Sequence, residues 1–314
     1  MTHIVPQLGG GGAPCLLREL RIYNCSSLIE LPDDLHSLNS LERLHISSCP
    51  ELKSIPYNPP IKSSSGEGQQ QQQQQQGFTS LRKLIIHDCK GLANLPIEMV
   101  CTPSLESLSL IKLISITNLG AVIGCLHKMT RLIELAIWEV PKFSIIKNGC
   151  SLSSLQELRM GPFSPADSSN VTFNETVGDM LLQCCISLRS LQLYGMEDWE
   201  CLPDQLQHLT SLKELYLKDF GMEALPEWFG NLQSLKTLFL GNCKKLRHLP
   251  SKQAMQRLSK LTSLDIYTCP LLLMEKRSND DDPQIVDSEW PKITHIPEVE
   301  VDFCLISSDS QGRH

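Results

Sequence analysis

The 314-residue sequence lacks the features that would assign it to several common functional classes. No apolar run approaches the roughly 20 residues of a membrane-spanning helix, and the N-terminal residues show no basic start followed by an apolar core. The GxxxxGK[ST], GxSxG, HExxH and kinase signatures are absent. These absences predict a non-enzymatic protein with no catalytic residue and no membrane association. They favour the cytoplasm, with a nuclear pool left open.

The chain also lacks an excess of positive charge, since its net charge is −7. Its N-terminal half is mildly basic, but acidic neighbours interrupt the basic residues. The residues concerned are Arg18, Arg21, Arg43, Lys83, His45 and His87. Because proteins that bind nucleic acids usually present a continuous basic face, the sequence disfavours a nucleic-acid partner.

Cysteine is plentiful, but its spacing is not that of a zinc site. The chain has 13 cysteines and no CxxC pair. We therefore predict buried thiols, no metal and no cofactor. Two alternatives stay open, a disulfide between the adjacent Cys184 and Cys185 and a site that combines His87 with Cys89.

The stretch from Leu212 to Pro250 contains the same pattern twice. Leucines recur as LxxLxL and are followed by an apolar residue or cysteine and then by Leu-Pro. The alternation of Leu215 and Leu217 around Tyr216 has a period of two residues, which is typical of a short strand with one buried face. A single copy cannot bury its leucines alone, so neighbouring copies must stack into a shared core.

Ten copies of the pattern follow one another along the chain. They begin at Leu17, Leu41, Leu81, Leu105, Leu132, Leu155, Leu188, Leu212, Leu235 and Leu261. We expect a flexible segment at 1–16, a repeat domain at 17–306 and a disordered tail at 307–314. Two longer intervals predict a disordered glutamine-rich insertion at 57–77 and a surface loop near 161–176.

Two further columns support this alignment of the copies. The ninth position is apolar or cysteine throughout. Its members are Cys25, Cys49, Cys89, Leu113, Val140, Phe163, Met196, Phe220, Cys243 and Cys269. A buried thiol suits the corner where the chain leaves the strand, because it is small and can donate weakly to a backbone carbonyl. A Leu/Ile-Pro pair recurs later in many copies and favours an extended segment over a regular helix.

The combined pattern LxxLx[LI]xxCxxLxxLPxx[LM] resembles the leucine-rich repeats of plant intracellular NB-LRR disease-resistance proteins. The ninth-position cysteines and the absence of an LxGxIP continuation distinguish it from receptor-type repeats. The segment from Glu289 to Val301 is similar to the closing segment of cereal-type members. The resemblance implies an α/β solenoid shaped as a horseshoe. It would have a concave parallel sheet of about ten strands and an irregular convex side.

The resemblance also implies a function. It indicates a protein-recognition module of innate immunity that senses a pathogen effector or a guarded host protein. In full-length relatives the repeats also restrain a nucleotide-binding switch domain. This chain shows neither that domain nor the coiled coil that precedes it, so we expect a fragment, a truncated product or a partner of a missing module. A substrate adaptor of a ubiquitin ligase is the alternative, and an upstream P-loop or F-box would decide between them.

The outward-facing strand residues are the candidate binding surface, because alternate strand residues face solvent. Aromatic residues make up only 5% of the chain, yet four of its five tyrosines stand at the fifth and seventh positions of the copies. The candidates for protein binding are Tyr194, Tyr216, Phe239 and Tyr267 in four consecutive copies, together with Trp138 and Tyr23. Clustered exposed aromatics usually mark contact surfaces. Aromatic packing that only stiffens the sheet is the alternative.

Overall fold

A computed structural model describes residues 16–32, 35, 38–56, 78–141, 143, 152–163, 169–272, 289–302 and 304–306. They belong to two compact units, Met1–Leu155 with Phe163–Asp167, and Gln156–Pro162 with Ser168–His314. The flexible segment expected at 1–16, apart from Leu16, lies outside the described residues, as do the insertion expected at 57–77 and the tail expected at 307–314. No helix in the described ranges is long and apolar enough to cross a membrane.

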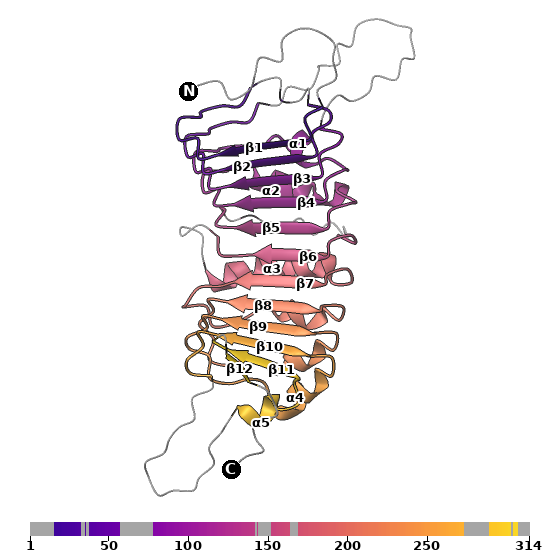
Figure 1. Ribbon diagram of the computed structural model, residues 1–314, viewed down its shortest axis with the longest axis vertical. Coiled ribbons are helices and arrows are strands. Elements are labelled where there is room, and N and C mark those ends of the chain that lie inside the picture. The colour runs from indigo at the N-terminus through magenta and orange to yellow at the C-terminus, as the bar shows by residue number, and fades with distance from the viewer. Residues whose placement is uncertain are drawn as a thin grey trace, which may run out of the picture. The chain divides into compact units, whose positions relative to one another are not determined.

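The first unit is a stack of parallel strands backed by short helices (Figure 1). Its strands are β1 (Glu19–Tyr23), β2 (Arg43–Ser47), β3 (Lys83–His87), β4 (Ser107–Ile111) and β5 (Glu134–Trp138). Its helical segments are α1 (Ile97–Val100), α2 (Leu119–Gly124) and the 3₁₀ turn Leu126–Lys128. Consecutive strands pair in register, so equivalent positions of neighbouring copies lie side by side.

The second unit repeats this plan and closes it with an antiparallel strand (Figure 1). Its strands are β6 (Glu157–Met160), β7 (Ser190–Tyr194), β8 (Glu214–Lys218), β9 (Thr237–Gly241), β10 (Ser263–Tyr267), β11 (Glu298–Val301) and β12 (Cys304–Ile306). Its helices are α3 (Asn170–Cys184), α4 (Lys252–Arg257) and α5 (Trp290–Ile293), with 3₁₀ turns at Asp204–His208 and Glu227–Asn231. The strands from β6 to β11 are parallel, and β12 pairs antiparallel with β11.

The leucines of each copy form the core, as the repeat pattern predicts. Leu215, Leu217, Leu238 and Leu240 are all 0% exposed. Each strand therefore buries one face and leaves the other to solvent. Because a single copy cannot bury its leucines alone, this arrangement requires neighbouring copies. Both units are stacks of leucine-rich repeats, and the expected α/β leucine-rich-repeat solenoid is confirmed.

The strands end at a backbone corner whose left-handed conformation the repeat pattern did not reveal. The residue after the seventh position has a left-handed φ, between 50° and 64°, in most copies of both units. The residues are Asn24, Ser48, Asp88, Lys112, Glu139, Asp219, Asn242 and Thr268, and Asp302 at the turn from β11 into β12 also has a left-handed φ. At such corners the backbone N–H donates to the next strand, for example from Asp219 to the Gly241 carbonyl at 2.9 Å. Asn and Asp are frequent there because they tolerate this conformation better than other non-glycine residues.

The ninth-position thiols follow this corner and bond as expected. The sulfur of each column cysteine donates to the seventh-position carbonyl of its own copy at 3.4–3.5 Å. The column consists of Cys25, Cys49, Cys89, Cys243 and Cys269, all of which are free thiols. Cys25 is only half-buried, because among the described strands β1 has a neighbour on one side. The vicinal Cys184 and Cys185 are also free thiols.

One pair of cysteines corrects the expectation that the chain has no disulfide. Cys101 and Cys125 are disulfide-bonded, with 6.0 Å between their α-carbons. Cys101 ends α1 and Cys125 ends α2, so the bond joins equivalent places in adjacent copies. Sequence reasoning missed this pair because the two residues are 24 apart, one full repeat, and belong to no short cysteine motif.

The expectation of a surface loop near 161–176 is wrong for the second half of that segment. Residues from Asn170 onward form α3, which is capped by Ser169 accepting a hydrogen bond from the Thr172 amide at 3.2 Å. Phe173 and Val177 lie on the buried side of this helix. Polar composition suggested a loop, but apolar residues at a helical spacing drive this segment against the core.

Met196 is the exception in the ninth column, since it is 37% exposed. Its copy lacks the left-handed corner, and Gly195 there lies against the ring of Phe220 from the following copy. The buried indole of Trp199 fills the core instead and packs on Phe173 at 4.5 Å between ring centroids. Met196 is therefore not part of the buried column.

The segment from Glu289 to Val301 attaches to the end of the second unit and contributes β11. The carboxylate of Glu289 is buried, with 4% of the residue exposed. It accepts from the Leu249 amide at 2.7 Å and from the Lys292 ammonium at 2.9 Å. In the preceding copy the equivalent amide, that of Leu225, donates to a backbone carbonyl of the next copy, that of His248. The Glu289 carboxylate thus takes the place that a backbone carbonyl of a further copy would occupy.

Candidate protein-interaction site

The outward face of β7–β11 contains the main cluster of predicted site residues. In register across these strands, the fifth positions are Gln192, Tyr216, Phe239, Asp265 and Glu300. The seventh positions of β7–β10 are Tyr194, Lys218, Gly241 and Tyr267. We call this surface, with the third-position residues of the same strands, the aromatic face. All of it belongs to the second unit.

Tyr216 and Phe239 form the centre of the aromatic face. They are register neighbours on β8 and β9, and their ring centroids are 5.8 Å apart. Gly241 lies beside them, and a β-carbon added there would approach Cε1 of Phe239 to 2.5 Å. The ring of Phe239 therefore rests on the bare backbone of Gly241. Glycine is required at this position because a side chain would collide with the ring, and not because of an unusual φ.

Tyr194 and Tyr267 flank this central pair from the seventh positions. Tyr194 is half-buried, and its hydroxyl donates to Oε1 of Gln192 at 3.3 Å. Tyr267 lies on β10 next to Gly241 and is 38% exposed. The structure thus places four of the predicted residues on one surface, and brings Tyr216 and Phe239 into ring contact.

Carboxylates surround the aromatic pair. Phe239 is in register with Asp265, and Asp265 is in register with Glu300. Burial raises the pKa of the Tyr216 hydroxyl, and the nearby carboxylates of Glu214 and Asp265 raise this pKa further. The face is therefore both aromatic and negatively charged.

Trp138 and Tyr23 belong to the first unit, whereas the aromatic face belongs to the second. Trp138 is a half-buried residue at the end of β5. Tyr23 is 42% exposed, and its hydroxyl is 2.6 Å from Nδ1 of His45. Partial burial lowers the pKa of His45, and the positive charges of Arg21, His87 and Lys83 lower this pKa further. Tyr23 thus lies in polar surroundings, whereas Trp138 is in register with the apolar Ile111 of β4.

The first unit carries a broad polar hollow of about 510 Å³ over the starts of β1–β5. It is lined by Glu19, Arg21, Glu42, Arg43, Leu44, His45, Arg82, Lys83, Ile85, Glu106, Ser107, Ile133 and Glu134. Its charges are largely paired, as in Arg21–Glu19 at 2.6 Å and Arg82–Glu106 at 3.0 Å. The basic residues of the N-terminal half therefore do not form a continuous positive face.

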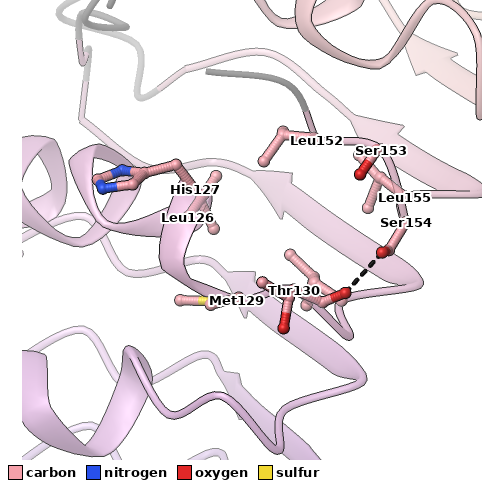
Figure 2. A pocket seen from close by; sticks show the side chains of 9 residues that line it. Leu126, His127, Met129, Thr130, Leu152, Ser153, Ser154 and Leu155 are labelled. Atoms are coloured by element: carbon pink, nitrogen blue, oxygen red, sulfur yellow. Dashed lines mark hydrogen bonds between the residues drawn. The ribbon is translucent and has the colours of Figure 1, made fainter.

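A second pocket lies between two consecutive copies of the first unit (Figure 2). Leu126 and Met129 line it from one copy and Leu152 from the next, and Ser154 bridges them by donating to the Thr130 carbonyl at 2.6 Å (Figure 2). Its volume is about 40 Å³. Since sites for small organic ligands measure roughly 300–1,000 Å³, this pocket is a packing gap. No group of three or more potential metal ligands occurs within the described part of the chain.

Sequence reasoning missed the parts of the aromatic face that are not aromatic. Gly241 could have been noticed as a glycine in a column otherwise rich in bulky residues. The outward fifth position of Asp265 follows from the repeat, but its pairing with Glu300 required the alignment of β11 on β10, which the irregular closing segment obscured.

Comparisons with known proteins agree with this architecture. Residues 204–269 match the family model described as R13L1/DRL21 LRRs. The chain is 26% identical to TMV resistance protein N of Nicotiana glutinosa over 250 residues, which are 75% of this chain and 20% of that protein. It is 28% identical to disease resistance protein RPP4 of Arabidopsis thaliana over 248 residues, 75% of this chain and 17% of that protein. The chain thus spans a fifth or less of these curated relatives.

Among solved structures, the leucine-rich repeat domain of the type III effector XopL aligns with 80% of this chain and 69% of its own, at 21% identity and a TM-score of 0.42. The resemblance to the leucine-rich repeats of plant disease-resistance proteins, which the sequence motifs indicated, is confirmed by the family model and by the curated relatives.

Proposed function

Starting from leucine-rich repeats similar to those of plant disease-resistance proteins, we propose that this chain is a non-enzymatic protein-recognition module of plant innate immunity. Its ligand is a pathogen effector or a guarded host protein, and its compartment is the cytoplasm. In full-length relatives the same repeats make restraining contacts with a nucleotide-binding switch domain. The matched family model describes repeats and names no reaction, which supports a binding role.

The observation that carries this proposal is the aromatic face. Tyr194, Tyr216 and Phe239 are half-buried and Tyr267 is exposed, on consecutive strands of one unit. With strands about 4.8 Å apart the cluster spans roughly 15 Å, which is the size of an interface hot spot. Aromatic side chains supply large contact areas and lose little conformational entropy when they are ordered at an interface.

The test is retention of protein partners from plant tissue extract by the immobilised chain. We compare the wild type with Tyr194→Ala, Tyr216→Ala, Phe239→Ala, Tyr267→Ala and the quadruple variant. At least one single change is expected to cost about 2 kcal/mol of affinity, or roughly 30-fold, because a few buried anchors dominate such interfaces. Thermal unfolding of each variant shows whether the fold is intact.

Trp228→Ala is the matched control. Trp228 is also a half-buried aromatic residue, but it lies in the 3₁₀ turn Glu227–Asn231 and stacks on Phe229 with 5.2 Å between centroids. The Trp228→Ala variant should retain the same partners as the wild type. Full retention by the quadruple variant would remove the aromatic face as the binding site. Loss of folding in the tyrosine variants would instead support a stiffening role for these rings.

A further inference from the structure

We propose that the aromatic face recognises a basic segment of its partner, in which lysine or arginine side chains meet the carboxylates of β8–β11 and stack on Tyr216 and Phe239. This inference rests on the proposed function and adds the chemistry of the partner. It is argued from charge complementarity on the described residues of the second unit.

The carboxylates of this face lie on neighbouring strands, where they repel one another. Asp265 and Glu300 are direct register partners on β10 and β11, and Glu298 precedes Glu300 on the same outward side. Like charges opposite each other on neighbouring strands are destabilising. Among the described residues neither Glu298 nor Glu300 forms an ion pair, and the bond that Asp265 accepts comes from the neutral Ser263 hydroxyl at 3.0 Å. A cationic ligand would relieve this repulsion.

The outward positions of β8–β11 carry an unbalanced charge. They comprise the four carboxylates of Glu214, Asp265, Glu298 and Glu300, and the single ammonium of Lys218. Lys213 and Lys236, which precede β8 and β9, form no ion pair with these carboxylates among the described residues. Among the described residues, the outward positions of β8–β11 therefore carry a net negative charge, and Arg159, the cation that acts on Tyr216, is itself paired with Glu157 at 3.6 Å.

The equivalent surface of the first unit shows that this imbalance is not general to the repeats. There the acids are paired with cations on the same copy or on a copy up to two away. Glu19 pairs with Arg21 at 2.6 Å, Glu134 lies 3.9 Å from the Lys83 ammonium, and Glu106 bonds both Arg82 and Arg131 at 3.0 and 3.1 Å. Among the outward strand positions that the structure describes, the acids without an ion pair lie on β8–β11, the strands that carry Tyr216 and Phe239.

The rings and the acids suit the same ligand group. A cation over an aromatic ring is attracted by the ring face, by about 0.5–2 kcal/mol depending on its desolvation. Asp265 follows Phe239 in the register of the sheet, so a guanidinium on the ring would have a carboxylate beside it. A neutral apolar segment could use the rings but would leave the carboxylates of Asp265 and Glu300 partly desolvated, which costs binding free energy.

The experiment measures binding of the whole chain to three labelled peptides by fluorescence anisotropy. The peptides have equal length and equal aromatic content and differ only in carrying lysine and arginine, glutamine, or glutamate. The basic peptide should bind at least about tenfold more tightly than the neutral one, and its affinity should fall as ionic strength rises. Equal or tighter binding of the neutral or acidic peptide would overturn the inference, as would no binding of the basic peptide.

Two double variants separate the contributions. Asp265→Asn with Glu300→Gln removes the charges but keeps an acceptor oxygen for Ser263, and should weaken the basic peptide about tenfold. Glu175→Gln with Glu200→Gln changes the net charge equally at exposed positions away from the face and should have no effect. Equal effects of the two would show that only the overall charge matters and would overturn the inference.

The proposed function can survive the failure of this inference. If the neutral peptide binds as well as the basic one and binding is lost in Tyr216→Ala with Phe239→Ala, the face binds protein without selecting cations. If that variant binds all peptides as the wild type does and also retains every partner from extract, the proposed function fails as well. Self-association of the chain that the same aromatic variant abolishes would assign the face to a second copy and overturn the basic ligand.

Discussion

The ring of Phe239 rests on the backbone of Gly241, two residues further along the same strand, and a β-carbon at Gly241 would lie 2.5 Å from Cε1 of the ring. The glycine thereby fixes the position of the ring that contacts Tyr216. This relationship makes the central pair sensitive to a change that removes no aromatic side chain.

Gly241→Ala is expected to displace the Phe239 ring and weaken binding at the aromatic face severalfold, while changing the free energy of unfolding by less than about 1 kcal/mol, since the ring can swing into solvent. The measurement pairs peptide affinity with thermal unfolding. Gly120→Ala is the control, because nothing lies within 4 Å of a β-carbon there. It lies in α2 and should stabilise by up to about 1 kcal/mol without affecting binding. An unchanged affinity for Gly241→Ala would contradict this account of the ring.

Glu289→Ala is expected to destabilise the end of the second unit by about 3 kcal/mol, because it leaves the buried Leu249 amide and the Lys292 ammonium without their acceptor. Hydrogen exchange should show faster opening of β10 and β11, and denaturant titration gives the magnitude. In the exposed pair of Glu197 with Lys244, Glu197→Ala should cost less than about 1 kcal/mol. Equal effects of the two changes would show that the buried carboxylate has no special role.

The buried thiols Cys49, Cys89 and Cys184 should resist modification in the folded protein. Burial raises the pKa of Cys89 to about 11 and that of Cys184 to about 12, so very little reactive thiolate exists near pH 8. The exposed Cys201 should react first, the half-buried Cys25 later, and Cys49 and Cys89 only on unfolding. Mass spectrometry of timed labelling with iodoacetamide gives this order. Rapid labelling of Cys89 in the native chain would contradict the buried column.

The bond between Cys101 and Cys125 should stabilise the first unit by about 2–4 kcal/mol, since it closes a loop of one repeat in the unfolded chain. Reductant should therefore lower the denaturant midpoint of the wild type. The Cys101→Ala, Cys125→Ala double variant should already have the lower midpoint and should not respond to reductant. A wild type that is equally stable with and without reductant would show that the bond contributes nothing in solution.

The repeat, its period and the buried positions could be read from the amino-acid pattern alone. Leu215, Leu217, Leu238 and Leu240 could be assigned to the core without coordinates, because a strand alternates its faces and a single copy has no other way to bury leucine. The column cysteines followed from the same alignment, including their bonds to backbone carbonyls. The outward position of the tyrosines followed as well, since it is the complement of the buried pattern.

Features that depend on contacts between copies or on irregular segments required the folded structure. The helix from Asn170 was hidden by its polar composition, because burial of Phe173 and Val177 against the core outweighs local preference. Cys101 and Cys125 meet because stacking places equivalent residues of adjacent copies together. The pairing of Asp265 with Glu300 likewise required the register between β10 and β11. A repeat sequence specifies which face of its strand each residue occupies. The side-chain neighbours of that residue in other copies are set by how the copies stack. On the aromatic face these neighbours determine where negative charge accumulates.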